Sequence, residues 1–259
     1  MTNNNLISAA LFTPNSVEFP NAWVGHLHFA AWVINEISPK IFVELGTHSG
    51  NSYFSFCQSV SENHLPTKCY AVDTWIGDDH SGKYNDDIFN KVNAHNQKHY
   101  AEFSKLLRMT FDDASTYFAE KSINVLHIDG LHTYEAVRHD FETWLPKLAT
   151  DAIVIFHDTN VRERNFGVWK LWEELQGHYP NNIEFKHSNG LGVLQLNNPE
   201  YGNNLKMLQS TYIEKQLLIN YFAALGSQQL KLYELNEIKQ LNTILNQTLA
   251  ECNQQIANY

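Results

Sequence analysis

IFVELGTHSG, residues 41–50, joins a buried apolar run to a turn with two glycines. The run 41–45 has the length and apolar content of a strand inside a sheet. Gly46 permits a tight turn, and Gly50 opens the next segment without a side chain, so the backbone there can approach a ligand closely. We therefore expect a strand, a ligand-binding loop and a helix in succession.

The same alternation continues along the chain. Further apolar runs lie at 69–75, 106–111, 123–129 and 152–158, and helix-like segments lie at 21–37, 51–61, 86–106, 114–121 and 134–149. Continuously apolar strands that alternate with helices belong to a parallel sheet covered on both faces. The expected fold class is α/β, a doubly wound Rossmann-like sheet.

The pattern changes after residue 158. A helix is expected over 166–179, and IEFKHSNGLGVLQL, residues 183–196, reads as two short strands around the turn Ser188-Asn189-Gly190. Such a turn closes a hairpin. We divide the chain into an N-terminal helical segment at 1–40, a ligand-binding domain at 41–198 and a helical tail at 199–259.

The tail is rich in Leu, Asn and Gln and has almost no Gly or Pro after residue 205. A heptad pattern places these residues at the a and d positions: Leu235, Ile238, Asn242, Leu245, Leu249, Cys252 and Ile256. A polar Asn at one a position can fix the register of a coiled coil. Two interpretations stay open, a helix folded onto its own domain and a coiled coil that makes the chain a homo-oligomer.

Composition narrows the class of ligand. Twenty-eight acidic residues against 18 basic ones give a net charge of −10, which disfavours nucleic acid or an anionic membrane surface as a partner. No run approaches 18 apolar residues and the start of the chain is polar, so neither a membrane span nor a secretory signal is expected, and we expect a cytoplasmic protein. The three cysteines have no CxxC spacing, so a disulfide framework or zinc site is not indicated.

The loop after residue 45 argues for one kind of cofactor. A dinucleotide site would need a further glycine between Gly46 and Gly50 for the pyrophosphate, but Thr47, His48 and Ser49 fill that interval. This disfavours a nicotinamide or nucleotide-sugar enzyme. S-adenosylmethionine has no pyrophosphate and carries a sulfonium and an ammonium group, which suits an acidic residue such as Glu44.

Acidic residues after the next two strands extend the expected cofactor site. Asp73 lies 73 − 46 = 27 residues after Gly46, where a carboxylate can accept hydrogen bonds from both ribose hydroxyls. Asp112 and Asp113 follow the third strand, where adenine is usually held, although one of the pair could instead cap the next helix. The expected cofactor contacts are Glu44, Gly46, Thr47, Gly50, Asp73, Asp112, Asp113 and Asp129.

A cluster of chemically active residues follows the fourth and fifth strands. HIDGLH supplies Asp129 and His132, and FHD supplies His157 and Asp158. The ends of adjacent strands in an open α/β sheet face one crevice. Asp129, His157 and Asp158 could hold Mg²⁺ or Mn²⁺ there, lowering the pKa of a bound hydroxyl. Asp129 and His132 are the expected catalytic residues, with His132 as the base.

Two further segments are expected to meet the substrate. The loop WIGDDHSGKYNDD at 75–87 is polar and glycine-punctuated, so it could close over the site through Asp78, His80 and Tyr84. Arg162, in a charged run after the fifth strand, could meet acceptor hydroxyls or phosphate. The alternatives are a surface loop and a solvated charge run.

Four motifs carry a resemblance to a known family: VELGTHSGNSYFSF, AVDTWIGDDHSGKY, HIDGLHTYEAVRHDFETW and FHDTNVRERNFGVWKLWEEL. Over about residues 20–197 the chain resembles bacterial methyltransferases that are often fused to, or encoded with, glycosyltransferases. More distantly it is similar to metal-dependent sugar O-methyltransferases. The resemblance implies a class I methyltransferase sheet, five parallel strands that finish in an antiparallel hairpin, with S-adenosylmethionine as the cofactor.

The sugar methyltransferases also imply roles for individual residues. They place a metal-binding Asp where Asp129 stands, a base where His132 stands and an acidic pair at the end of the fifth strand. This chain departs from the pattern because His157 replaces the first acid of that pair. The expected function is O-methylation of a sugar hydroxyl in a polysaccharide or glycosylated metabolite, with a glycosyltransferase as an expected partner. The alternative is a non-catalytic, cofactor-binding scaffold module.

Overall fold

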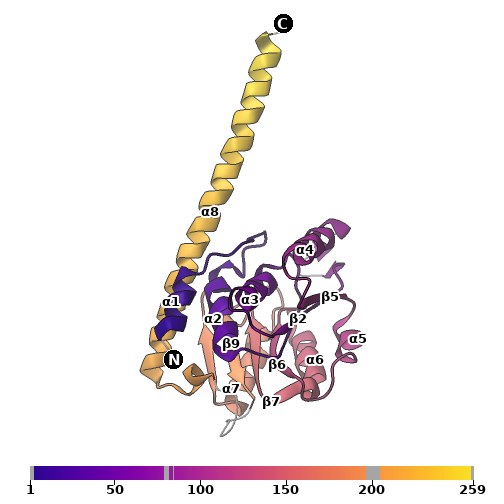
Figure 1. Ribbon diagram of the computed structural model, residues 1–259, viewed down its shortest axis with the longest axis vertical. Helices are drawn as coiled ribbons and strands as arrows, with labels where there is room; N and C mark the ends of the chain where they lie inside the picture. The colour runs from indigo at the N-terminus through magenta and orange to yellow at the C-terminus, as the bar shows by residue number, and fades with distance from the viewer. Residues whose placement is uncertain (1–2, 79–81, 84, 197–204, 258–259) are drawn as a thin grey trace.

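The computed structural model describes residues 3–78, 82–83, 85–196 and 205–257. At its centre lies a sheet that is flanked by helices (Figure 1). The sheet has seven strands in the order β5-β2-β1-β6-β7-β9-β8. The strands are β1 (Ile41–Leu45), β2 (Lys68–Asp73), β5 (Ser104–Arg108), β6 (Ile123–Ile128), β7 (Leu148–His157), β8 (Asn182–Phe185) and β9 (Leu191–Gln195).

The pairing confirms the predicted architecture. β5, β2, β1, β6 and β7 run parallel, and β9 pairs antiparallel with both β7 and β8. The apolar runs became strands because both faces of the sheet are buried. Successive strands are added on one side of β1 up to β5 and then on its other side from β6 onward. This reversal leaves a crevice at the carboxyl ends of β1 and β6.

Helices cover the two faces of the sheet. Side chains alternate along each strand, so Phe42 faces one layer while Val43 faces the other. The first layer contains α1 (Asn3–Leu11), η1 (Val24–His26), α2 (Leu27–Ile37), α3 (Asn51–Glu62), α4 (Asp86–His99) and the start of α8 (Tyr212–Ala257). The second contains α5 (Phe111–Ser115), α6 (Tyr134–Trp144) and α7 (Val168–His178).

Some boundaries differ from those predicted. The helix expected over 21–37 begins as the 3-10 turn η1, and α2 starts at Leu27. The run 106–111 does not continue as a strand to its end, because Thr110 caps α5 by accepting a hydrogen bond from the amide of Asp113. Short 3-10 turns, η2 (Leu145–Lys147) and η3 (Lys206–Gln209), precede β7 and α8.

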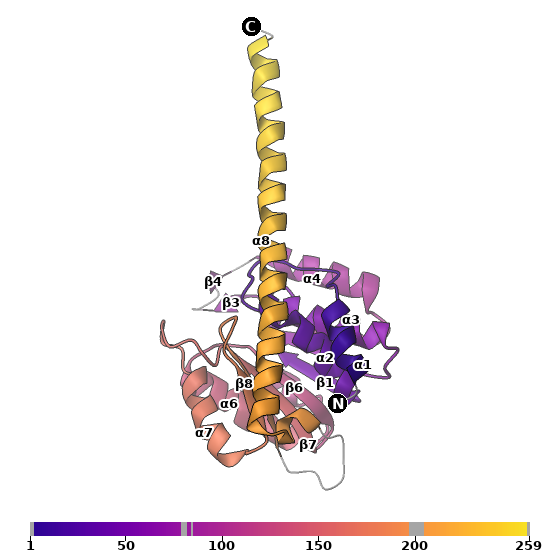
Figure 2. The same cartoon turned by 90° about the vertical axis from the view of Figure 1, so that its left-hand side faces the viewer.

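The tail forms one helix of 46 residues, α8. Leu218 and Phe222 near its start are buried against the first layer. From residue 234 to 256 every residue is exposed, and the helix extends away from the domain (Figures 1 and 2). The heptad segment is therefore not folded onto its own domain. In the described ranges, no helix combines the length and the apolar character that crossing a bilayer requires.

Candidate active site

A cavity of ≈ 830 Å³ lies at the carboxyl ends of the central strands. Its walls come from the loop between β1 and α3, the ends of β2, β6 and β7, and the segment before η1. Ligand sites of small-molecule enzymes are about 300–1,000 Å³. The cavity is therefore large enough for a cofactor, and it occupies the crevice that the strand order predicts.

The loop after β1 is shaped by its glycines. Gly46 has φ +85°, and a Cβ there would lie 2.0 Å from the carbonyl oxygen of Asp129. The β1–α3 loop thus packs directly against the end of β6, with no room for a side chain. Gly50 also has a positive φ, +88°, and a Cβ there would meet the ring of Phe54 at 2.5 Å. Gly46 lines the cavity, whereas Gly50, an expected cofactor contact, does not and instead leaves room for the ring of Phe54.

Asp73, predicted to hold ribose, organises this loop. Its Oδ2 accepts hydrogen bonds from the amides of Thr47 and His48, each 2.9 Å away. Its Oδ1 accepts another, 2.7 Å long, from the amide of Trp75. A carboxylate has roughly four acceptor positions, so one is left for a ligand. Asp73 and Thr47 both line the cavity.

Glu44 lies beneath the loop and outside the cavity lining. It is fully buried, and His127 Nδ1 lies 2.8 Å from its Oε2. Trp23 Nε1 donates to His127 Nε2 over 3.3 Å. Because an indole N–H can only donate, His127 must carry its proton on Nδ1 and donate it to Glu44. This buried chain fixes Trp23, which does line the cavity.

Asp112 and Asp113 occupy the first turn of α5 and do not line the cavity. Asp113 Oδ2 accepts a hydrogen bond of 2.7 Å from Thr110 Oγ1. The N-cap is Thr110, so Asp113 supports the cap from inside the helix and does not itself take the expected capping position. Asp112 pairs with His139 at the surface, 2.8 Å away. The cavity wall here is formed by Thr110 and Phe111 instead.

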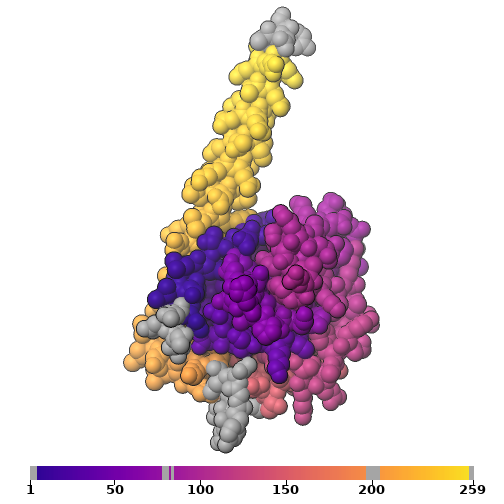
Figure 3. Space-filling model, viewed as in Figure 1, coloured from indigo at the N-terminus to yellow at the C-terminus, as the bar shows by residue number. Residues whose placement is uncertain are grey.

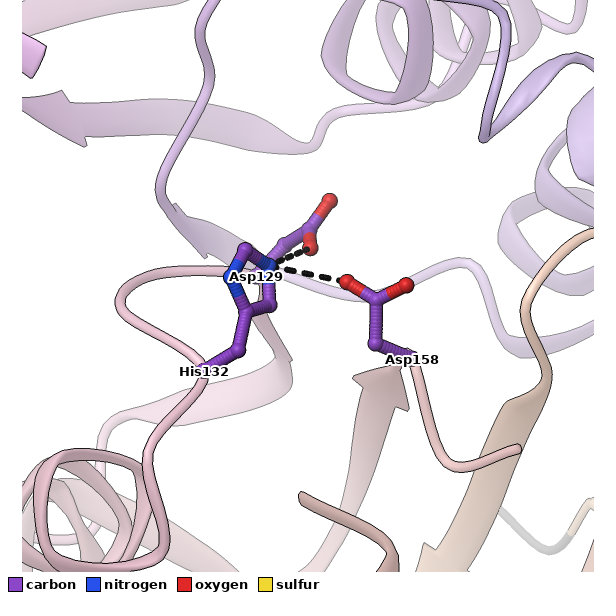
Figure 4. A group of neighbouring side chains, drawn as sticks. All are labelled: Asp129, His132 and Asp158. Carbon is purple, nitrogen blue, oxygen red and sulfur yellow. Dashed lines mark ion pairs between the residues drawn. The ribbon is translucent and has the colours of Figure 1, made fainter. Parts of the chain in front are cut away.

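Asp129, His132 and Asp158 also line the cavity. Their side chains converge from the ends of β6 and β7 (Figure 4). His132 Nε2 lies 2.8 Å from Asp158 Oδ2 and 3.6 Å from Asp129 Oδ1. Its ring stacks on Phe166 at 4.5 Å with an interplanar angle of 8°. The ring orientation is therefore set by an aromatic face and two carboxylates.

Asp158 has two features of a functional residue. Its backbone is left-handed, with φ +61°, which is uncommon for a residue with a side chain. Its Oδ1 is buried without a hydrogen-bond partner among the described residues. A buried carboxylate oxygen without a partner is costly, so a ligand hydroxyl or cation would be stabilised there.

His157 is held differently from the expected metal ligand. Its Nδ1 lies 3.2 Å from Asp129 Oδ1 and 3.4 Å from Asp158 Oδ2, and its Nε2 lies 3.1 Å from the carbonyl oxygen of Ser188. All three partners only accept, so both ring nitrogens donate and neither offers a lone pair. The side chains whose ligand atoms lie within 4.8 Å of one another are Asp129, His132 and Asp158.

Charge is balanced inside this cluster. Burial alone would lower the pKa of His132, but its hydrogen bonds to Asp129 and Asp158 raise that pKa to about 9. Burial likewise opposes charge on His157, yet the attraction of Asp158 and Asp129 raises its pKa well above the ordinary value. Burial favours neutral carboxyls, but His157 and His132 hold the pKa of Asp129 and of Asp158 well below the usual range.

The predicted substrate contacts are only partly placed. Asp78 lies in β3 (Gly77–Asp78), which pairs with β4 (Gly82–Lys83) after β2. His80 and Tyr84 fall outside the described residues. Arg162 turns to the surface, where it pairs with Glu173 at 3.1 Å and lies over the ring of Trp169.

Several cavity residues escaped the sequence analysis. Arg164, two residues beyond Arg162, lines the cavity and lies over the ring of Phe166. Phe166 and Trp23 fall within the helices expected at 166–179 and 21–37, and Phe111 ends the apolar run expected as a strand at 106–111. Gly25 lies within the first expected helix, where glycine is unfavourable. It could have indicated that Trp23 lies before the regular helix.

Part of the chain matches a known protein family. Residues 43–159 match the family described as a methyltransferase domain. The chain is 43% identical over 225 residues to the uncharacterized protein y4gI of Sinorhizobium fredii, an alignment that covers 86% of this chain and 24% of that protein. The chain therefore spans about a quarter of the length of this curated relative.

Two solved structures have a fold similar to that of this chain. The SAH-bound methyltransferase PaMTH1 of Podospora anserina matches with a TM-score of 0.53 and 12% identity, over 75% of this chain and 88% of that one. Cofactor-bound Rv0187 from MTB matches with a TM-score of 0.51 and 12% identity, over 76% of this chain and 91% of that one. Residues 43–159 thus match a methyltransferase-domain family, and the chain shares the fold of these solved structures.

Proposed function

We propose that this chain transfers a methyl group from S-adenosylmethionine to a hydroxyl oxygen of a sugar, in a polysaccharide or a glycosylated metabolite. One observation carries the proposal. The imidazole of His132, bonded to the buried Asp158, shares a cavity with the glycine loop after β1. A positioned base and a cofactor loop in one cavity are what methyl transfer to a hydroxyl needs.

The residues of the cavity fit the cofactor. S-adenosylmethionine, when bound, would supply the methyl group as an electrophile on sulfur. The close approach at Gly46 leaves the loop backbone open to the ligand, and Asp73 retains an acceptor position for a ribose hydroxyl. Phe111 offers an apolar face for adenine. Thr47 also faces the cavity.

His132 takes the role of base in this proposal. The acceptor hydroxyl gives its proton to the neutral imidazole of His132 as the oxygen attacks the methyl carbon and the carbon–sulfur bond breaks, while Nε2–H keeps its hydrogen bond to Asp158. Asp158 and Asp129 stabilise the imidazolium that forms, because their carboxylates lie 2.8 Å and 3.6 Å from that nitrogen. The partnerless Oδ1 of Asp158 can accept a hydrogen bond from a neighbouring hydroxyl, which favours an acceptor with several hydroxyls.

The rate should rise with pH, because His132 accepts a proton only when neutral. Its pKa of about 9 means that the neutral fraction grows tenfold per pH unit below that value and levels off above it. Asp158→Asn, which the left-handed backbone tolerates, should move the rising limb towards the ordinary histidine pKa of about 6.5. A kcat/KM profile that is flat or falls between about pH 6 and about pH 9 would exclude His132 as the base.

A divalent cation is the alternative source of deprotonation. Asp129, His132 and Asp158 have the donor types that Mn²⁺ or Mg²⁺ takes, and such an ion would lower the pKa of a bound hydroxyl. However, a His132 that bound an ion through one ring nitrogen would carry its proton on the other and could not also act as the base. The positive His157 beside the carboxylates also opposes a second cation. We therefore assign deprotonation to His132.

Chelation separates these mechanisms. Dialysis of the protein against EDTA is expected to leave kcat unchanged, and added Mg²⁺ or Mn²⁺ should not raise it. The control is a parallel sample dialysed without chelator. If EDTA abolished activity and Mn²⁺ or Mg²⁺ restored it, a metal and not His132 would activate the hydroxyl.

The acceptor is tested with a methyl-labelled cofactor. Transfer is expected to sugars with free vicinal hydroxyls, to fail with the same sugars already O-methylated, and to fail with amines. Transfer to amines alone would contradict the proposed acceptor. A glycosyltransferase that supplies the sugar is the partner that the proposal implies. A purely structural module would not need three buried ionisable groups, Asp73, His157 and Asp158, in the lining of one cavity, and this favours the enzyme.

A further inference from the structure

The free end of α8 carries an apolar stripe with no covering element among the described residues. The seven heptad positions from Leu235 to Ile256 lie in the segment where every residue is exposed. Ile238, Leu245 and Leu249 expose 55%, 56% and 52% of their surface. Apolar side chains in such a row are costly to leave in water, so this stripe is built for a partner.

The stripe lies on the side of α8 that faces away from the domain. Gln229, the last buried residue of the helix, marks the side that packs on the domain. Ile238 follows it by 238 − 229 = 9 residues, and nine residues at about 3.6 per turn make about two and a half turns. The stripe therefore points opposite to the domain. A second helix could lie along it without displacing the body of the molecule, beyond which this end projects (Figure 3).

We propose that this stripe binds the same stripe of a second copy of the chain, as a parallel, in-register, two-stranded coiled coil. Asn242 stands at an a position, and in a parallel pair it meets its own equivalent, where the two amides can hydrogen-bond. In an antiparallel pair a positions face d positions, so the amide would be buried against an apolar side chain. The buried Asn thus selects the parallel arrangement.

Charges beside the stripe select the same arrangement. Glu234 occupies a g position and Lys239 the e position of the next heptad, 239 − 234 = 5 residues later. In a parallel, in-register pair, g of one helix lies beside the following e of the other. Each Glu234 then meets Lys239 of the second copy, once on either side of the interface. Both residues are exposed and neither has an ion pair among the described residues.

Sedimentation equilibrium over a range of concentrations tests the association. The expected result is a mass approaching twice the 29.8 kDa of the chain. Ile238→Asp combined with Leu245→Asp should leave a monomer, because the double substitution places negative charges in the apolar stripe. Gln240→Asp and Gln247→Asp, at outward-facing f positions, form the matched control and should not change the mass. The proposal would be overturned by a wild-type monomer at every concentration, by a trimer, or by a dimer that survives the substitutions in the stripe.

Charge exchange tests the pairing. E234K and K239E should each weaken the dimer, since each puts like charges together, and the double variant E234K/K239E should restore it. Failure of the double variant to recover affinity would contradict the parallel register. Circular dichroism of each variant establishes that α8 is still helical.

Cys252 reports the register directly. It stands at a d position and is exposed, whereas Cys57 and Cys69 are buried. In a parallel, in-register pair the two Cys252 side chains lie next to each other, so mild oxidation should yield a covalent dimer that dithiothreitol reverses. Cys252→Ser should prevent it. A dimer in solution that does not cross-link would mean an antiparallel or shifted pairing, and the proposal would fall.

Discussion

His132→Asn should lower kcat for methyl transfer by about 10²–10⁴-fold, the usual contribution of a positioned general base. The substitution removes the group that takes the proton but keeps a side chain of similar polarity against Phe166. Affinity for the cofactor should change little, because in the proposed arrangement His132 serves the acceptor. Steady-state kinetics together with a cofactor titration separate the two effects.

The chain offers a matched control for this substitution. His178, at the end of α7, is exposed, and its Nδ1 donates to the carbonyl of Glu174 in its own helix. His178→Asn should retain the wild-type rate. A His132→Asn variant that also kept the wild-type rate, with its fold intact, would remove the base from the mechanism.

Gly46→Ala should abolish cofactor binding and destabilise the fold. A positive φ costs a residue with a side chain about 1–3 kcal/mol, and overpacking adds about 1–3 kcal/mol. The new Cβ would lie 2.0 Å from the backbone oxygen of Asp129, which cannot rotate away as a side chain could. The loop must therefore move off the end of β6. Thermal unfolding and calorimetric titration with S-adenosylhomocysteine measure the two consequences.

Gly177→Ala is the control for Gly46→Ala. It lies inside α7, has no positive φ, and a Cβ there would meet nothing within 4 Å. Because Ala is favoured over Gly within helices by roughly 0.5–1 kcal/mol, this variant should be as stable as the wild type or slightly more so. Equal stability and equal cofactor affinity of Gly46→Ala and the wild type would contradict the described loop packing.

The sheet was predictable from the sequence because its strands are buried on both faces. IFVEL became β1 with the predicted bounds, and the turn at Ser188-Asn189-Gly190 became the end of the β8–β9 hairpin. The predicted boundaries of elements were wrong where a single hydrogen bond decides where a strand or helix ends. The cap at Thr110 ends the strand run early, and periodicity cannot detect such a bond.

The site was only partly predictable, because the partners of its residues are remote in sequence. Adjacent strand ends placed Asp129, His132 and Asp158 together, as expected. The role of His157 could not be inferred, since it depends on the carbonyl of Ser188, 31 residues away. Likewise, only the folded loop shows that Asp73 accepts hydrogen bonds from Thr47 and His48.

Calorimetric titration of the folded chain with S-adenosylhomocysteine tests the central claim most directly. We expect saturable binding with one site per chain, retained in Gly177→Ala and lost in Gly46→Ala, and no heat with NAD under the same conditions. Binding of NAD, or no binding of S-adenosylhomocysteine to protein that unfolds cooperatively, would contradict it.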